Sequence, residues 1–250
     1  MIVVRLLFAS LALLAFAQSG YAAGDTFEAR GLLVPYEQAR LASRAQGVIE
    51  SIRREGEAVK KGDVVMALES RMEELQLAQQ KHILDLRAFE HRASDELNSK
   101  SVISKNEVEE KRVNHEVSKV QFSQAEHLLD KRRVIAPFDG AVAERLREAG
   151  EAVDEFVPVL LLVNLSNLYL EAFLPGELIG KVSPGDPVEV RAGEAIVVRG
   201  QVAQIAPTVN PASGEFKVRV LVPNADGRLI SGTYAAATFG KPQTDTVSKP

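Results

Sequence analysis

The feature that most constrains this chain is the segment 71–132, which contains neither glycine nor proline. It is rich in Glu, Lys, Arg, Gln and Ala, which favour helices, whereas Gly or Pro would cost about 1 or 3 kcal/mol in a helix interior. The helical pattern is interrupted only at residues 98–104, which predicts two long helices joined by a short turn. At 1.5 Å per residue, arms of about 27 residues reach roughly 40 Å. We therefore expect an antiparallel α-helical hairpin that projects from the rest of the molecule.

The segments on either side of this stretch repeat one pattern. Each has two glycines in short, largely polar segments, followed by an apolar run. The run covers residues 64–68 in the first copy and 159–163 in the second. The glycines are Gly47 and Gly56 in the first copy, and Gly140 and Gly150 in the second. Each copy reads as strand, turn, strand, with Gly where the turn needs a positive φ or a close backbone approach. Two such halves are expected to close into one small β-sandwich.

A third region follows the second copy. Short apolar runs between residues 168 and 239 alternate with turns that contain Pro and Gly, which is typical of a β-barrel or sandwich. We expect Pro35 to end a lead-in strand, and residues 164–167 to form a turn into this region. The predicted fold is α+β with several domains: a sandwich from 39–70 and 133–166, the hairpin at 71–132, a β-barrel from 24–38 and 167–240, and a disordered tail at 241–250.

The N-terminus resembles an export signal. Arg5 precedes an apolar core at residues 6–17, and small residues follow at 20–22, so a signal peptide is predicted at 1–23. The apolar core is shorter than the roughly 20 residues of a membrane-spanning helix. We expect the mature protein in the periplasm. The alternative is an uncleaved signal that anchors it to the inner membrane.

Composition excludes several classes of function. The formal net charge is −4, which argues against a nucleic-acid partner. The chain has no Cys and therefore no disulfide, thiolate metal site or cysteine nucleophile. It also lacks a phosphate-binding loop, a nucleophile-elbow serine and paired histidines at zinc spacing. We expect no catalytic, cofactor or metal site. A hydrolase that uses barrel carboxylates is an enzymatic alternative that no spacing supports.

Two patterns concern the interior of the hairpin. In the first arm Leu75, His82 and Phe89 recur every seven residues. In the second arm the apolar row is Val113, Val117 and Val120, then Phe122, Ala125 and Leu129. We expect these rows to form the seam between the arms. All four histidines also lie in the hairpin. Folding the arms back on each other would bring His91 level with His115, and His82 near His127. Such pairs could bind a metal weakly or act as a pH-sensitive joint, or they could be ordinary seam and surface residues.

The glycine-bearing repeat resembles the two halves of a biotinyl/lipoyl domain, so the sandwich is expected to be lipoyl-like. In carrier proteins of that fold the halves meet at a tight turn that bears a modified Lys. In this chain that turn would follow residues 68–70, where the hairpin is inserted, and Lys60 and Lys61 lie at a different turn. A biotinyl or lipoyl carrier is therefore only a remote alternative.

A split lipoyl domain with a helical insert, followed by a β-barrel, is similar to the periplasmic adaptors (membrane fusion proteins) of the HlyD and resistance–nodulation–division (RND) efflux families. Residues 202–210, 218–220, 223–224 and 229–233 resemble the barrel of adaptors that serve RND pumps. The resemblance covers about residues 27–240. It implies a non-enzymatic adaptor that connects an inner-membrane transporter to an outer-membrane channel and assembles into a ring, commonly of six copies. An ABC-type exporter or a type I secretion system is the alternative to an RND pump.

The same resemblance points to the hairpin tip as the docking site for the outer-membrane channel. In the family the tip is similar to an Arg, Leu, Ser pattern. Leu97 and Ser104 stand at the expected separation here, but Ala93 stands where the Arg is expected, and Arg92 lies one residue earlier. Val102 and Ile103 are apolar at an end that should face water. The predicted docking residues are Arg92, Leu97, Val102, Ile103 and Ser104.

The end of the chain departs from many family members, which carry a membrane-proximal domain after the barrel. Only a short polar tail, residues 241–250, follows the predicted barrel. The Cys that usually carries a lipid anchor is also missing. The resemblance then implies that the inner-membrane transporter contacts the barrel and the lipoyl-like body.

Overall fold

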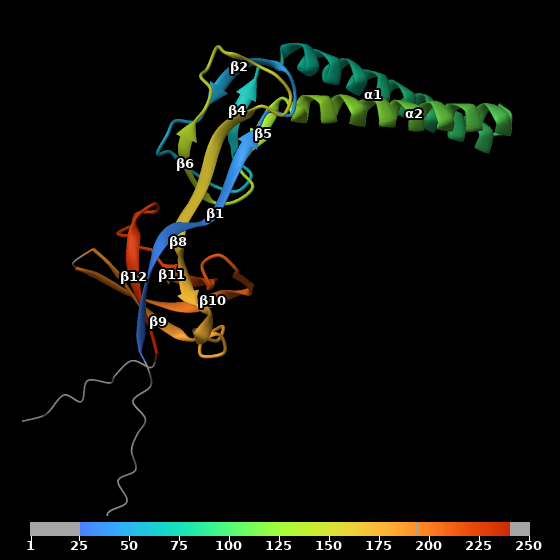
Figure 1. Ribbon diagram of the computed structural model, residues 1–250. Coiled ribbons are helices and arrows are strands. Elements are labelled where there is room, and N and C mark those ends of the chain that lie inside the picture. Colours follow the sequence, from blue (N-terminus) through green and yellow to red (C-terminus); the bar gives the residue numbers. More distant parts are fainter. Residues whose placement is uncertain (1–25, 194, 241–250) are drawn as a thin grey trace, which may run out of the picture.

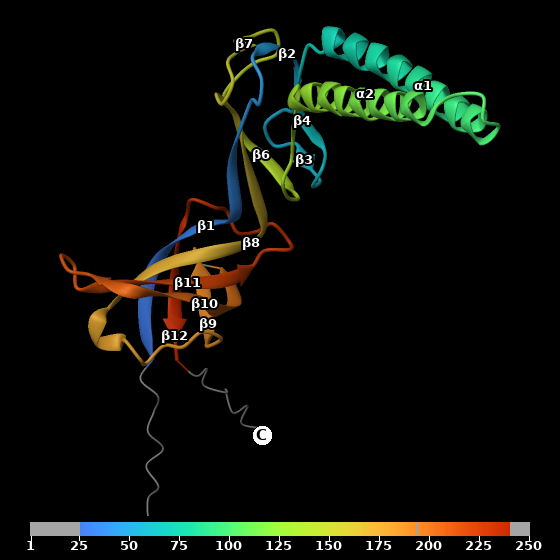
Figure 2. The same cartoon turned by 90° about the vertical axis from the view of Figure 1, so that its right-hand side faces the viewer.

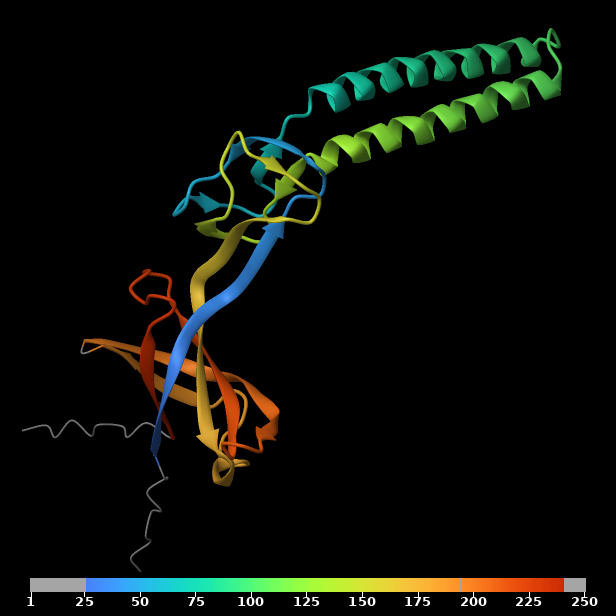
Figure 3. The same cartoon turned by 45° about the horizontal axis from the view of Figure 1, so that its top comes forward.

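The computed structural model describes residues 26–193 and 195–240 (Figure 1). The predicted signal peptide at 1–23 and the predicted tail at 241–250 lie outside the described residues. The chain forms a β-barrel, a β-sandwich next to it, and a helical hairpin that leaves the sandwich sideways and stays clear of the barrel (Figure 3). The predicted fold class, a hairpin inserted into a split β-domain that a barrel follows, is confirmed.

The hairpin consists of α1 (Arg71–Ser99) and α2 (Lys105–Lys131), which run antiparallel. Ser104 is the N-cap of α2, and its hydroxyl accepts a hydrogen bond of 3.2 Å from the backbone N–H of Glu107. Such a cap satisfies one of the free N–H groups at a helix start. At 1.5 Å per residue, each arm is about 40 Å long.

The sandwich contains β2 (Gly47–Ile52), β3 (Ala58–Val59), β4 (Val64–Leu68), β5 (Arg133–Ile135), β6 (Gly140–Arg145) and β7 (Ala152–Val153). The two copies of the repeat exchange strands. β7 of the second copy pairs with β2 of the first, and β3 of the first pairs with β6 of the second. Each sheet therefore contains strands of both copies, rather than one sheet per copy. The enclosed core includes Ile49, Met66, Leu68, Val142 and Leu160.

The barrel is formed by β1 (Phe27–Ala42), β8 (Pro158–Pro175), β9 (Pro187–Ala192), β10 (Ile196–Asn210), β11 (Glu215–Pro223) and β12 (Tyr234–Phe239), with a short 3-10 helix, η1 (Gly176–Leu178), after β8. The antiparallel order β1-β12-β9-β10-β11-β8 closes through pairing of β8 with β1. Closure leaves no free sheet edge. Its core includes Leu33, Leu170, Phe216 and Val218, all almost fully buried.

β1 and β8 run through both the barrel and the sandwich (Figure 2). The expectation that Pro35 ends the first strand is wrong, and so is the expected turn at 164–167. Pro35 pairs with Leu168, and the ladder shifts register between Pro35 and Glu37. A bulge bends a strand and tolerates a residue without an N–H donor, so the chain changes direction there without leaving the sheet.

The expected seam of the hairpin is wrong except near the end of α2, where Ala125 is buried and Phe122 and Leu129 are half-buried. Leu75, His82 and Phe89 are exposed on α1, as are Val113, Val117 and Val120 on α2. The buried seam positions are instead small: Ser94 on α1, and Ser118 and Ala125 on α2. The Ser94 hydroxyl donates to the His91 carbonyl at 2.7 Å, and the Ser118 hydroxyl to the His115 carbonyl at 2.8 Å. Small residues whose hydroxyls are satisfied by their own helix allow the arms to approach closely.

Candidate functional site

The repeated glycines hold the halves of the sandwich together. Gly56 and Gly150 have φ values of 78° and 90°, a region that disfavours residues with a Cβ. The N–H of Gly56 donates to the Val142 carbonyl at 2.8 Å, and the N–H of Gly150 donates to the Ile49 carbonyl at 2.7 Å. Each glycine turn therefore pairs with the other copy. At Gly140 a Cβ would overlap the carbonyl oxygen of Val163 on β8.

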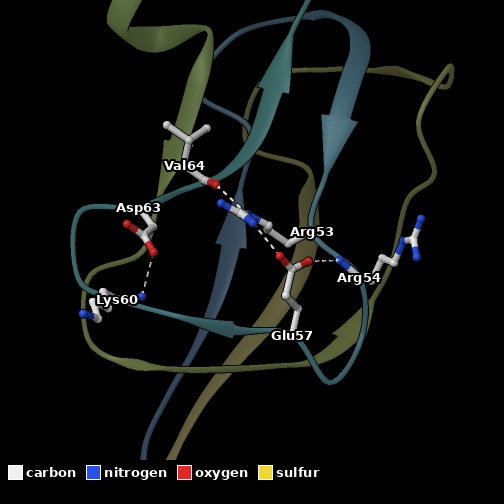
Figure 4. A network of polar contacts seen from close by, with 6 residues as sticks. All are labelled: Arg53, Arg54, Glu57, Lys60, Asp63 and Val64. Atoms are coloured by element: carbon white, nitrogen blue, oxygen red, sulfur yellow. Dashed lines mark hydrogen bonds and ion pairs between the residues drawn. The ribbon is translucent and has the colours of Figure 1, made fainter.

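In the first copy, side-chain carboxylates accept hydrogen bonds from backbone groups of the turns (Figure 4). The Glu57 carboxylate accepts a hydrogen bond from the Arg54 N–H at 3.1 Å and another from the Arg53 guanidinium, and these bonds lower the pKa of Glu57. The Asp63 carboxylate accepts from the Lys60 N–H at 2.9 Å. These polar contacts stabilise turns, so the lysine-bearing turn at Lys60 and Lys61 has a structural role.

The base of the hairpin is clamped to the sandwich by Arg132, which the sequence analysis did not single out. Its guanidinium forms an ion pair with Glu73 at the start of α1, and donates to the Gln46 carbonyl at 2.7 Å. A Cβ on Gly47 would lie 2.8 Å from Nη1 of Arg132, so the glycine makes room for this arginine. Arg44 adds hydrogen bonds to the carbonyls of Asp130 and Arg133, at 2.6 and 3.1 Å. In the sequence, the signal for this contact was Gly47, whose missing side chain leaves space for the guanidinium.

The far end of the hairpin is the predicted docking site. Four of its five residues lie in or beside the turn between α1 and α2: Leu97, Val102, Ile103 and Ser104. Leu97 is 41% exposed and Val102 is 64% exposed. The Leu97 carbonyl accepts hydrogen bonds from the N–H groups of Lys100 and Val102, at 3.2 and 3.0 Å, which fixes the turn. The tip thus presents apolar side chains on a rigid support.

Arg92 does not share this position. It lies five residues before Leu97 on α1, which places it about 140° around the helix from Leu97 at 100° per residue. Its Nε donates to the Ala88 carbonyl at 3.3 Å. Lys100 and Lys105, both exposed, are the basic residues next to the turn. A cationic contact at the tip itself would therefore come from these lysines.

The histidines form one pair. The rings of His91 and His115 lie 5.8 Å apart, centroid to centroid, at 39° to each other. His82 and His127 are both exposed on outward faces, and among the described residues no contact joins them. Nδ1 of His91 lies 3.7 Å from the Asp95 carboxylate. Nowhere in ranges 26–193 and 195–240 do three or more His, Asp or Glu side chains gather as metal ligands would.

Apolar rows lie along the outer edges of the hairpin. We define the α1 edge as Met72, Leu75, Leu86 and Phe89, and the α2 edge as Val113, Val117, Val120 and Leu128. All eight side chains are exposed. At 100° per residue each row is centred roughly 90–120° around its helix from the buried seam residues, so the rows flank the seam. Five of the eight were expected in the seam: Leu75, Phe89, Val113, Val117 and Val120. Neither helix of the described chain has the length and apolar character needed to cross a membrane.

Two family models match this architecture. One, described as a CzcB-like barrel-sandwich hybrid domain, matches residues 37–164, and the other, described as a CusB-like β-barrel domain, matches residues 167–243. The chain belongs to the membrane fusion protein family of periplasmic adaptors. The family is non-enzymatic. The resemblance inferred from the glycine repeat and the hairpin is thereby confirmed.

Curated relatives of the adaptor are distant in sequence. An uncharacterized protein of Haemophilus influenzae is 25% identical over 88% of the chain, and the nodulation protein NolF of Rhizobium meliloti is 26% identical over 84%. The cobalt-zinc-cadmium resistance protein CzcB of Cupriavidus metallidurans is 23% identical over 81%. The adaptor chain spans 59%, 53% and 42% of these three proteins, about half of their length.

Solved structures share the fold. A chimera of MacA that contains the MexA α-hairpin domain of Pseudomonas aeruginosa has a TM-score of 0.76 at 18% identity, over 86% of the adaptor chain and 79% of the chimera. A putative efflux transporter of Bacteroides eggerthii has a TM-score of 0.71 at 19% identity, over 90% and 72%. ZneB of Cupriavidus metallidurans has a TM-score of 0.54 at 19% identity, over 86% and 99%.

Proposed function

We propose that this protein is the periplasmic adaptor of a tripartite RND-type efflux system for metal cations. The observation that carries the proposal is the split globule with a projecting hairpin, combined with a barrel that matches the CusB-like model of RND adaptors. Three curated relatives are named for resistance to, or efflux of, cations. In this role the chain connects an inner-membrane RND transporter to an outer-membrane channel. It catalyses no reaction itself, and the transporter supplies the energy for efflux.

The direct test of this role is loss of resistance. Deletion of the gene is expected to sensitise the host to cobalt, zinc, nickel or cadmium salts, and expression of the chain from a plasmid is expected to restore growth. Crosslinking in intact cells should recover an inner-membrane transporter with the adaptor. Recovery of a transporter with a nucleotide-binding domain, in place of an RND protein, would assign the chain to an ABC-type exporter.

The hairpin tip is the proposed contact with the outer-membrane channel. Leu97→Asp places a charge in the exposed apolar surface of the tip, and Ser104→Arg removes the N-cap of α2 and adds bulk. Both variants are expected to abolish resistance while the protein accumulates and folds, because removal of an N-cap costs only about 1 kcal/mol. Resistance assays and circular dichroism measure the two properties.

A matched control lies on the shaft of the hairpin. Ser123 is exposed on α2, far from the tip and rotated by about 60° or more from every residue of the α2 edge. Ser123→Arg makes the same substitution as Ser104→Arg and is expected to leave resistance intact. Full resistance in the Leu97→Asp and Ser104→Arg strains would contradict the assignment of the tip, whereas an equal loss in all three would indicate general damage to the hairpin.

The two edges support self-assembly into a ring of six copies. Because the arms are antiparallel and His91 lies level with His115, Leu86 comes level with Val120, and Phe89 with Val117. The α1 edge of one copy can therefore meet the α2 edge of the next without a vertical shift. Such a head-to-tail contact closes into a ring when the rotation permits. A ring would also multiply weak tip contacts into firm binding of the channel.

A further inference from the structure

The turn after β7 (Figure 2) differs in its residues from its counterpart in the first copy of the repeat. In the first copy the turn after β3 contains Gly62 at φ 93°, and the Asp63 carboxylate caps it. The corresponding residues of the second copy are Phe156 and Val157. The N–H of Gly62 donates to the Ala136 carbonyl at 2.9 Å, and that of Phe156 donates to the Ser43 carbonyl at 2.8 Å, so the two turns are held in the same way.

Phe156 is strained and exposed at once. Its φ is 66°, a conformation in which the Cβ of an L-residue crowds the backbone. The side chain is 74% exposed, so burial within its own chain does not offset the strain. Gly at this position would relieve the strain, as Gly62 does in the first copy. A bulky residue kept in such a conformation on the surface points to a contact outside the chain.

The surroundings of Phe156 indicate where that contact lies. Glu155, its neighbour, forms an ion pair of 4.0 Å with Lys131 at the end of α2. Lys131 follows Val117 by fourteen residues, two heptads, and therefore lies on the same face of α2 as the α2 edge. This ion pair ties the turn that carries Phe156 to the α2-edge face at the base of the hairpin.

We propose that Phe156 is an aromatic anchor for a second copy of this chain, and that it seats on Met72 and Leu75 of that copy. The proposal rests on the ring proposed above. Met72 and Leu75 begin the α1 edge, at the hairpin base where the Leu68 N–H donates to the Arg132 carbonyl at 2.8 Å. They are 74% and 49% exposed. Met sulfur and aromatic rings make favourable contacts, and buried aromatic anchors dominate many interfaces.

The first test separates folding from association. Phe156→Gly is expected to leave the thermal stability of the monomer unchanged or raised, because the strain is removed, and to weaken self-association about tenfold or more. Analytical ultracentrifugation of the full chain measures the association. Ile230→Ser is the matched control: Ile230 is 68% exposed on the barrel, outside both edges, and its loss should not change association. Unchanged association of Phe156→Gly would overturn the proposal.

The second test uses the absence of cysteine from the chain. The double variant Phe156→Cys and Met72→Cys is expected to form disulfide-linked multimers under mild oxidation, whereas Phe156→Cys with Ile230→Cys is not. The double variant Leu86→Cys and Val120→Cys tests the ring separately. If only the Leu86–Val120 pair crosslinks, the ring stands and the anchor is wrong. If neither pair crosslinks, both the ring and the anchor fail, and the resistance assay still decides the adaptor role.

Discussion

Gly47 and Gly140 occupy equivalent places in the repeat but exclude a side chain for different reasons. At Gly140 the obstacle is the backbone of Val163, and at Gly47 it is the flexible guanidinium of Arg132. A backbone carbonyl cannot move aside without disturbing the sheet. A guanidinium can move, but only by giving up its contacts with Glu73 and Gln46. The two glycines should therefore respond differently when Arg132 is removed.

A double-mutant cycle tests this difference. Gly47→Ala and Arg132→Met are each expected to cost about 1–3 kcal/mol of unfolding free energy, through the loss of the same partly buried contacts of Arg132 with Glu73 and Gln46. Their combination should cost clearly less than both together, with a coupling of about 0.5–3 kcal/mol. Urea unfolding followed by circular dichroism gives the values.

Gly140→Ala is the control for this cycle. Its cost is expected to be the same with and without Arg132, because Val163 and Arg132 lie in different parts of the sandwich. Additive costs for Gly47→Ala and Arg132→Met would show that the Gly47 site is limited by something other than the arginine.

In the hairpin, the buried residues of the seam are small and partly polar, whereas the outer edges are apolar. Nδ1 of His91 is buried without a hydrogen-bond partner among the described residues. His91→Leu removes this unsatisfied atom and adds apolar surface to the seam, so it is expected to stabilise the hairpin by about 1 kcal/mol or more. Amide hydrogen exchange along α1 and α2 measures the change.

His82→Leu is the matched control, because His82 is exposed on the same helix. It should change hairpin stability by less than about 0.5 kcal/mol. Destabilisation by His91→Leu would show that His91 contributes a specific contact, with His115 or Asp95, that outweighs the unsatisfied nitrogen.

The hairpin also shows how far local sequence patterns reach. The lack of Gly and Pro between residues 71 and 132 was enough to predict both arms and the tip. Which face of each arm meets the other was predicted wrongly, except around Ala125 on α2, because the rows that contain Phe89 and Val117 are the most apolar ones. An apolar row predicts burial, but it does not distinguish burial within the chain from burial against another copy. The small residues Ser94, Ser118 and Ala125 mark the true seam.

The same limit applies to the sandwich. The repeat predicted its two halves, because each half shows its own turns and strands. The exchange of strands between the halves depends on pairing of distant segments, such as β3 with β6, which no local pattern reveals. Phe156 was missed although aligning the two copies places it against Gly62. The signal was a mismatch within the repeat, whereas the prediction rested on its matches.

At the scale of the whole molecule, β1 and β8 join the barrel and the sandwich without a linker. Strands that belong to two cores should make those cores unfold together. Phe216→Ala, in the barrel core on β11, is expected to cost about 3–5 kcal/mol and to lower the hydrogen-exchange protection of the sandwich strands β2 and β6 as well. The reciprocal variant, Ile49→Ala in the sandwich core, should lower protection in the barrel. Protection that falls only in the mutated half would show two independent domains.

The chain enters the hairpin from β4 and leaves it into β5, and these strands pair side by side, with Ala67 opposite Arg133. Both ends of the hairpin are therefore fixed at one place, the β4–β5 pair of the sandwich. The length of the hairpin can change by whole heptads, equally in both arms, while this strand pair stays the same. The reach of the hairpin can therefore be changed, by evolution or by design, without changes in the sandwich or the barrel.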